Sequence, residues 1–232
     1  MTSVSFTTPS LTSTKAYYVK ASNDCGTVTS RTATVTVRSL PPPTGLVATA
    51  NGTSSVTISW NESTDAHHYV LERKSNGSGF GPIQSVYGKS VTNSGLDANQ
   101  TYVYRVRAVS SGEAVSSDPS NADLATTMVF SPLVAGQTKI AAAHFEELLS
   151  AVNAVRAAKG TPFATWSSIL PADVPAPAIG VRIDRQHLLS LRSAMNSARA
   201  ALGFAGLSYS DPTLSDVPIT VVQQTEIRGG VQ

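Results

Sequence analysis

The sequence predicts a multidomain fold in which a β-sandwich is followed by an all-α region. Apolar residues alternate with polar ones over about 44–127, as in strands that bury one face. From Thr138 onward the apolar period changes from two to about 3.6, the period of amphipathic helices. We expect five segments: a β-rich start at 1–38, a proline-rich linker at 39–43, the sandwich at 44–127, an apolar linker at 128–137 and the helical region at 138–232.

The first segment contains the run 17–26, followed by an alternating stretch at 32–37, and Cys25 lies in the turn predicted between the two strands. They resemble the last two strands of a bacterial immunoglobulin-like domain, with Tyr17 as its structural corner tyrosine. The resemblance implies an incomplete domain in which Cys25 has lost its partner or pairs between molecules. The alternatives are a buried free thiol and, with less support, a nucleophile.

The proline-rich linker and the sandwich follow. The prolines at 41–43 favour an extended, semi-rigid spacer. In the sandwich, Trp60 is expected in the core, and the run 96–102 matches a tyrosine corner, in which the Tyr102 hydroxyl bonds to the backbone of the loop before it. One strand should place Tyr104, Val106 and Ala108 inside and Val103, Arg105 and Arg107 outside, with both cations in solvent.

These features resemble a fibronectin type III domain over about 41–127. The resemblance implies a seven-strand antiparallel sandwich. The Arg-Gly-Asp tripeptide by which some members of the family bind integrins is absent, so no adhesive activity is implied. After the sandwich, the linker 128–137 is apolar, and Phe130 or Leu133 should pack against the helical unit and fix the orientation of the two parts.

The helical region repeats with a shift of 43 residues. The shift aligns the following pairs: Ile140 and Ile183, His144 and His187, Leu148 and Leu191, Asn153 and Asn196, Arg156 and Arg199, Gly160 and Gly203, Trp166 and Tyr209, and Asp173 and Asp216. Thr138 is expected to cap the first helix, and the second should run over about 182–202. Residues 219–232 restart the pattern. We therefore expect two full repeats and one partial repeat in a small helical bundle.

This pattern resembles a helical repeat at the C-terminal ends of large exported bacterial proteins. The shared elements are the spacing of Ile183, His187, Leu191 and Arg192, and the arm at 209–212. The first copy departs from it at Leu149, where arginine is expected, and the third at Gln223, where histidine is expected. The resemblance implies a modular architecture and no particular chemistry.

The candidate binding residues are His144, His187, Trp166 and Tyr209. The histidines could bind a metal, but we favour core histidines that satisfy loop carbonyls and position the arm, because no set of ligands recurs with them. Arg156 and Arg199 are expected to bond the last helix carbonyls or Asp173 and Asp216. Trp166 and Tyr209 should plug repeat junctions; the alternative is that all four line one groove.

Adjacent His67 and His68 are expected to point to opposite sides of their strand, which is poor metal geometry. No glycine loop for phosphate, zinc-protease motif or nucleophile elbow is present, so we expect no catalytic residue, cofactor or metal. Charged residues are 14% and the net charge is +2, without a basic cluster, so we expect no nucleic-acid partner. Nor does the sequence hold an apolar run long enough for insertion into a membrane.

The predicted function is a non-catalytic spacer, scaffold and protein-interaction segment of a secreted or cell-surface bacterial protein. The alternative is an accessory C-terminal region of an exported polysaccharide- or protein-degrading enzyme, with a protein or a polysaccharide as partner. The first residues, 1–5, lack a secretory signal. We therefore expect either a cytosolic protein or, with more support, a chain that begins inside a longer one.

Overall fold

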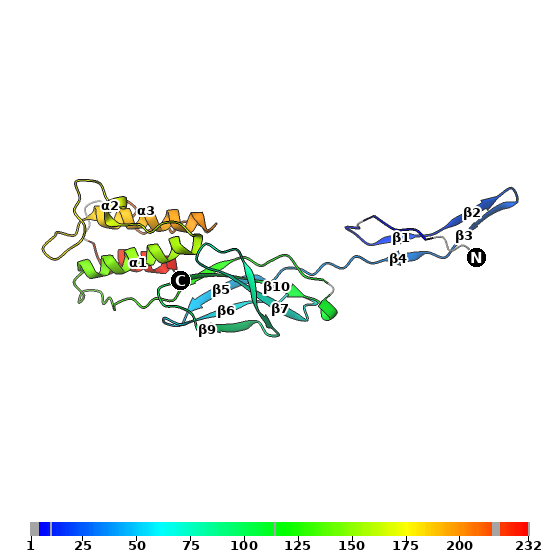
Figure 1. Cartoon of the computed structure of the whole chain (residues 1–232), viewed down its shortest axis with the longest axis horizontal. Coiled ribbons are helices and arrows are strands. Elements are labelled where there is room, and N and C mark those ends of the chain that lie inside the picture. The colour runs from blue at the N-terminus through cyan, green and yellow to red at the C-terminus, as the bar shows by residue number, and fades with distance from the viewer. Residues whose placement is uncertain (1–4, 10, 114, 215–218, 232) are drawn as a thin grey trace.

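The computed structural model describes residues 5–9, 11–113, 115–214 and 219–231. Along the chain follow a β-hairpin, a β-sandwich and a group of helices (Figure 1). The predicted combination of a β-sandwich and a helical part is confirmed. No helix in the described ranges is both long and apolar enough to cross a membrane.

The hairpin consists of β1 (Lys15–Tyr17), β2 (Lys20–Asn23), β3 (Gly26–Thr29) and β4 (Ala33–Val35). β1 pairs with β4 and β2 with β3, both antiparallel. Almost every residue in it is exposed; Tyr17 is half-buried, with its ring 6.2 Å from that of Phe6. Cys25 is exposed at the turn, so the alternative of a buried thiol is wrong.

The sandwich has seven strands in two antiparallel sheets. The strands are β5 (Thr44–Ala50), β6 (Ser55–Asn61), β7 (His68–Lys74), β8 (Gly81–Val86), β9 (Ser90–Ser94), β10 (Thr101–Val109) and β11 (Asp123–Thr126), with the short 3₁₀ helix η1 (Ser111–Glu113) after β10. One sheet has the order β5-β6-β9 and the other β11-β10-β7-β8. Alternation along each strand places one apolar face in the shared core.

Aromatic residues organise this core. Trp60 is buried against Tyr69, with ring centroids 5.4 Å apart in an edge-on arrangement. Tyr102, the second residue of β10, is buried, and the Asp97 N–H in the preceding loop donates to its hydroxyl at 3.0 Å. This bond ties the loop to the strand that follows it.

The outer face of β10 differs from its prediction. Val103 is buried, because helix α1 (Ala142–Lys159) contacts β10 and β11 from outside the sandwich. Arg105 and Arg107 do not extend freely into solvent. Both are half-buried, and their Nε atoms lie 2.5 and 3.1 Å from the two carboxylate oxygens of Glu72.

The other helices are the single turn α2 (Trp166–Ile169), α3 (Arg185–Ala201), α4 (Val221–Arg228) and the 3₁₀ turn η2 (Gly229–Val231). Gly160 ends α1 in a left-handed conformation, as predicted (φ 79°). Thr138 does not cap α1. The N-cap is Ala141, whereas the Thr138 hydroxyl accepts a bond from Val134 N–H in the preceding turn.

The sandwich and helices meet at two glycines. The Gly77 N–H, in the β7–β8 loop, donates to Ala158 O at 3.2 Å, at the C-terminal end of α1. A Cβ on Gly77 would lie 2.9 Å from Gly160 Cα. In the linker, Met128 is buried in the helical core, and Phe130 packs against it as predicted.

Candidate functional site

The repeated histidines lie at the third position of their helices and accept a hydrogen bond from the N-cap backbone. Ala141 N–H donates to His144 Nδ1 at 3.0 Å, and Asp184 N–H donates to His187 Nδ1 at 3.1 Å. In the third copy Gln223 Oε1 accepts from Thr220 N–H at 2.9 Å. Gln is an ordinary capping residue at this position. The change from His to Gln therefore preserves the capping interaction.

His187 also binds the segment between α1 and α3, which is the arm of the first repeat. Because its Nδ1 accepts from Asp184, its Nε2 carries the hydrogen and donates to Pro175 O at 2.9 Å. The ring is fully buried, edge-on to Phe145 and Trp166. Both nitrogens are thus engaged, and nowhere in the described ranges do three or more His, Cys, Asp or Glu side chains gather as metal ligands would. The arrangement is that of a structural histidine.

Asparagine side chains of the helices bind the backbone of the arms. Ala164 N–H donates to Asn153 Oδ1 at 2.6 Å, and Asn153 Nδ2 donates to Ala164 O at 2.9 Å. Asn196 makes the same pair of bonds to Leu207, at 2.7 and 3.3 Å. Each asparagine amide therefore pairs with the arm as a neighbouring strand would.

Repeated arginines continue the same attachment. The Nε atoms of Arg156 and Arg199 donate to Pro162 O and Ala205 O. These carbonyls belong to the segments after the helices. The Nε atoms therefore bind neither the last helical carbonyls nor Asp173, which were the predicted partners. The other predicted partner, Asp216, lies outside the described residues.

A cluster between α3 and α4, which we call the second clasp, consists of Arg192, Tyr209, Ser210 and Glu226. The Arg192 guanidinium lies 4.3 Å from the Tyr209 ring centroid and 2.8 Å from Glu226 Oε2, and Ser210 N–H donates to Glu226 Oε1 at 2.8 Å. Burial opposes ionisation of Glu226, but the bonds from Ser210 and the charge of Arg192 outweigh it and lower its pKa. The arm is thus held between a cation and an anion from two helices.

A cluster with the same construction joins α4 back to α1, and we call it the third clasp. The Arg228 guanidinium lies 4.6 Å from the Phe130 ring centroid and 3.1 Å from Glu147 Oε2. Ser131 N–H donates to the same carboxylate at 3.2 Å, and Arg228 donates to Ser131 O at 2.7 Å. The segment at 130–131, expected to be linker, therefore occupies the place of an arm.

A sequence signal for this first arm exists, but the 43-residue comparison missed it. Phe130 precedes His144 by 14 residues, as Tyr209 precedes Gln223, and a serine follows each aromatic residue. The repeat was defined as a helix followed by its arm, and this definition hides the match because the first arm precedes the first helix. Along the chain, each of α1, α3 and α4 is preceded by an arm with an aromatic residue.

The junction between α1 and α3 lacks a clasp. Leu149 stands where Arg192 and Arg228 stand in the other copies, and Ser190 stands in the place of Glu147 and Glu226. The arm here carries Trp166, whose Nε1 donates to Glu146 Oε1 at 2.6 Å. At this junction, apolar burial and one charged hydrogen bond replace the arginine–glutamate ion pair of the two clasps.

The four candidate binding residues therefore lie at repeat contacts. His187 and Trp166 are buried, whereas His144 and Tyr209 are half-buried. Burial raises the pKa of the Tyr209 hydroxyl to about 12. None of the four lines the pocket described next.

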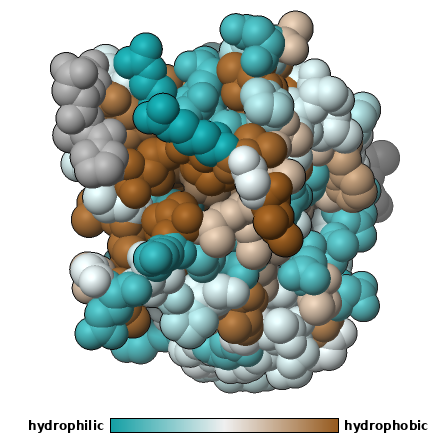
Figure 2. Space-filling view, turned by 90° about the vertical axis from the view of Figure 1, so that its left-hand side faces the viewer, coloured by the Kyte–Doolittle hydropathy of each residue, from teal (hydrophilic) through white to brown (hydrophobic). Residues whose placement is uncertain are grey.

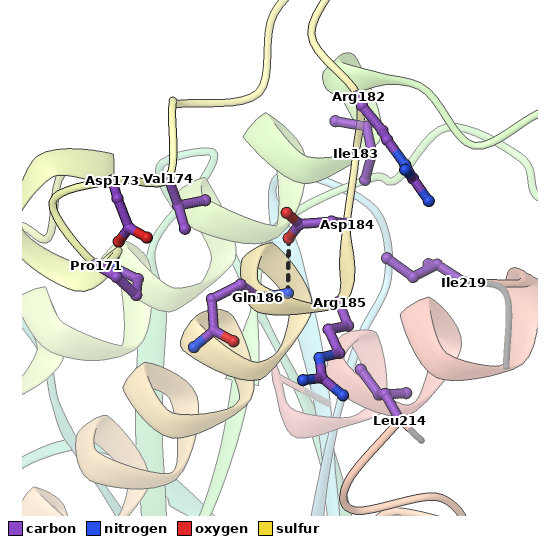
Figure 3. Close-up of a pocket in the computed structure, with 10 residues that line it drawn as sticks. All are labelled: Pro171, Asp173, Val174, Arg182, Ile183, Asp184, Arg185, Gln186, Leu214 and Ile219. Atoms are coloured by element: carbon purple, nitrogen blue, oxygen red, sulfur yellow. Dashed lines mark hydrogen bonds between the residues drawn. The ribbon is translucent and has the colours of Figure 1, made fainter. Parts of the chain in front are cut away.

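The end of the helical unit away from the sandwich carries a hydrophobic surface bordered by hydrophilic side chains (Figure 2). A pocket of about 820 Å³ opens there beside the first turn of α3. Figure 3 shows Asp184 above this turn, with its carboxylate accepting the Gln186 N–H at 2.8 Å. Arm residues such as Asp173 and Ile219 form other walls of the pocket. Among the described residues that line it there is no Ser, Cys or His.

Three kinds of comparison place part of the chain. The family model described as "Fibronectin type III domain" matches residues 41–123. A poly(3-hydroxybutyrate) depolymerase of Ralstonia pickettii is 45% identical over 85 residues, which are 37% of this chain and 16% of that protein. The chain thus spans about a sixth of the length of that relative.

Solved structures also match the chain, at lower identity. An Fn3-like protein from Clostridium thermocellum is 24% identical, with 42% of this chain and 99% of that chain covered and a TM-score of 0.35. The FN1–FN3 domains of chicken CNTN1 are 22% identical, with 51% and 44% covered and a TM-score of 0.36. With the family match over 41–123 and the seven-strand sandwich, residues 41–123 are a fibronectin type III domain.

Proposed function

We propose that the chain is a non-catalytic structural segment of an exported bacterial protein, in which the sandwich and the helical unit act as one rigid spacer. The observation that carries this proposal is the direct contact between the two units. Gly77 and Gly160 meet without side chains between them, and Met128 and Phe130 join the helical core immediately after β11. A flexible tether would not bury its apolar residues in the unit that it carries.

The same contacts suggest a division of the chain. We propose an immunoglobulin-like segment at 1–38, a spacer at 39–43, the sandwich at 44–127 and a helical unit whose first arm begins at Phe130. In this division, 128–137 is a junction that belongs partly to the helical unit, because the third clasp includes Phe130 and Ser131.

The experiment is a ¹⁵N relaxation measurement on the whole chain. A rigid spacer requires one rotational correlation time for residues of the sandwich and the helices. Two different correlation times, with faster tumbling of the smaller unit, would overturn the proposal.

A second function is favoured by the depolymerase relative. We propose as the alternative that the segment is an accessory region of an exported polymer-degrading enzyme whose catalytic part lies elsewhere. The relative's name refers to a polyester, so a hydrophobic polyester replaces polysaccharide as the first partner to test. The apolar end surface of the helices would suit such a partner (Figure 2).

Co-sedimentation with particles tests this alternative. The whole chain is mixed with poly(3-hydroxybutyrate) granules, with cellulose particles as the polysaccharide control. Saturable binding to the granules alone supports the polyester; binding to cellulose alone supports the polysaccharide of the original prediction. Absence of binding to both would leave the spacer as the function.

A further inference from the structure

His67 and His68 bring their ring nitrogens together, contrary to the prediction that they point apart. His67 Nδ1 lies 3.3 Å from His68 Nδ1, and the rings are nearly perpendicular, at 88°. The reason is local. His67 lies in the bend before β7, whereas His68 is the first residue of the strand, so the alternation of a regular strand does not apply to the pair.

The backbone and a neighbouring ring hold both histidines in place. His67 N–H donates to Val109 O at 2.8 Å, and His68 is paired with Val109 in the β7–β10 register. The Tyr87 ring lies against both imidazoles, with centroids 5.7 and 5.5 Å away. His68 is buried, whereas His67 and Tyr87 are exposed, so the pair is supported from the inside and open to solvent outside.

We propose that this pair is a binding site for a divalent transition-metal cation such as Zn²⁺, Ni²⁺ or Cu²⁺. Two nitrogens at about 2.0–2.1 Å from a tetrahedral zinc ion are about 3.3–3.4 Å apart. The observed separation of the two Nδ1 atoms is 3.3 Å, which matches the separation required of two ligands of one cation. Imidazole is a ligand that suits these metals.

The ligand set is completed by water. No third His, Cys, Asp or Glu joins the pair to form a larger metal-binding group within the described residues. In the free protein, one Nδ1–H donates to the other Nδ1. On binding, the hydrogen on Nδ1 leaves and Nε2 of that ring takes one up, so both rings stay neutral and no net proton is released. The site is therefore expected to bind more weakly than a four-ligand structural zinc site.

The test is titration of the whole chain with ZnCl₂ or NiCl₂ at pH 7.5, followed by the imidazole NMR signals and by calorimetry. All samples carry Cys25→Ser, because the exposed thiol is itself a metal ligand. His144 and His187 serve as controls in the same spectra. We expect one equivalent to perturb His67 and His68 together, before either control.

The variant His67→Ala tests whether the two nitrogens act together. His67 is exposed, so its removal leaves the sandwich core intact. We expect at least a tenfold weaker metal affinity, and loss of the rise in the melting temperature that the metal produces in the parent chain. A second variant, His68→Gln, should show the same loss. Unchanged affinity in His67→Ala, or simultaneous perturbation of His144, would overturn the proposal.

Discussion

Arg228 lies against Phe130, with the guanidinium 4.6 Å from the ring centroid. Arg228 also donates to the carbonyl of Ser131, the residue after Phe130, from which 97 residues separate it in the sequence. Arg192 and Tyr209 repeat this relationship at 4.3 Å. In both clasps the arginine of one helix and the glutamate of another hold an arm between them. The C-terminal helix is therefore attached to the start of the helical unit, which closes the set of three helices.

Removal of the third clasp should destabilise the helical unit. In Arg228→Met the Glu147 carboxylate loses a charged partner and Ser131 O loses its donor. Hydrogen bonds to charged groups contribute about 1.5–3 kcal/mol, and we expect a loss of this order in the free energy of unfolding. Urea unfolding followed by circular dichroism at 222 nm measures it. Arg182→Met, at an exposed arginine, is the control and should change the free energy little.

The capping interpretation predicts that His187 tolerates glutamine better than leucine. Gln can accept the Asp184 N–H as Gln223 accepts that of Thr220. Leucine leaves that N–H and Pro175 O without their partner, at a cost of about 1–3 kcal/mol. Thermal unfolding of His187→Gln and His187→Leu compares the two. Equal destabilisation by both substitutions would contradict the capping interpretation.

Replacement of Gln224 by an apolar residue should stabilise the protein. It is fully buried one residue after the capping position, as Phe145 and Leu188 are in the other copies, and neither of its amide atoms has a hydrogen-bond partner in the part of the chain that the structure describes. Because an unpaired buried amide costs about 1–3 kcal/mol, Gln224→Leu is expected to raise the free energy of unfolding by about that amount. Its neighbour Gln223 caps α4, so Gln223→Leu should lower it. Chemical unfolding of both variants gives the two signs.

The contact between sandwich and helices should depend on Gly77. It has a φ of 73°, and in Gly77→Ala the new Cβ would meet Gly160 Cα. The left-handed conformation alone costs about 1–2 kcal/mol for a residue with a side chain. We expect a lower melting temperature and separate rotational correlation times for the two units. Gly79→Ala is the matched control, because no atom lies within 4 Å of a Cβ at Gly79.

Alkaline pH should destabilise the protein through two tyrosines. Burial raises the pKa of Tyr209 to about 12, and burial raises that of Tyr104 further. Above pH ~10 the unfolded chain loses these protons whereas the folded chain keeps them, so the free energy of unfolding falls as pH rises from about 10 to 12. Absorbance at 295 nm should show both tyrosines still protonated at pH 11 in the folded state.

The variant Tyr209→Phe separates the contribution of Tyr209. It should show a smaller fall in the free energy of unfolding over this pH range than the parent chain. The contribution of Lys74, whose pKa is lowered by burial and by the charges of Lys159 and Arg105, cancels in the comparison. Tyr87→Phe, at an exposed position, is the control. The same pH dependence in Tyr209→Phe and the parent chain would contradict the assignment.

The sequence by itself determined the features that depend on neighbours along the chain. Alternation predicted the sandwich, and the 3.6-residue period with Gly160 and Gly203 predicted α1 and α3. The place of Tyr102 in the corner followed from the loop immediately before it. Each of these rests on local geometry, which a short stretch of residues specifies.

Only the tertiary structure decided which surfaces are covered and which side chains meet. Val103 is buried because α1 lies on its sheet, and Phe130 becomes an arm because Arg228 reaches it from the other end of the helical unit. His67 and His68 converge because the bend before β7 interrupts the alternation of side chains. These outcomes depend on contacts between distant residues and on backbone bends, neither of which the periodicity of the sequence encodes.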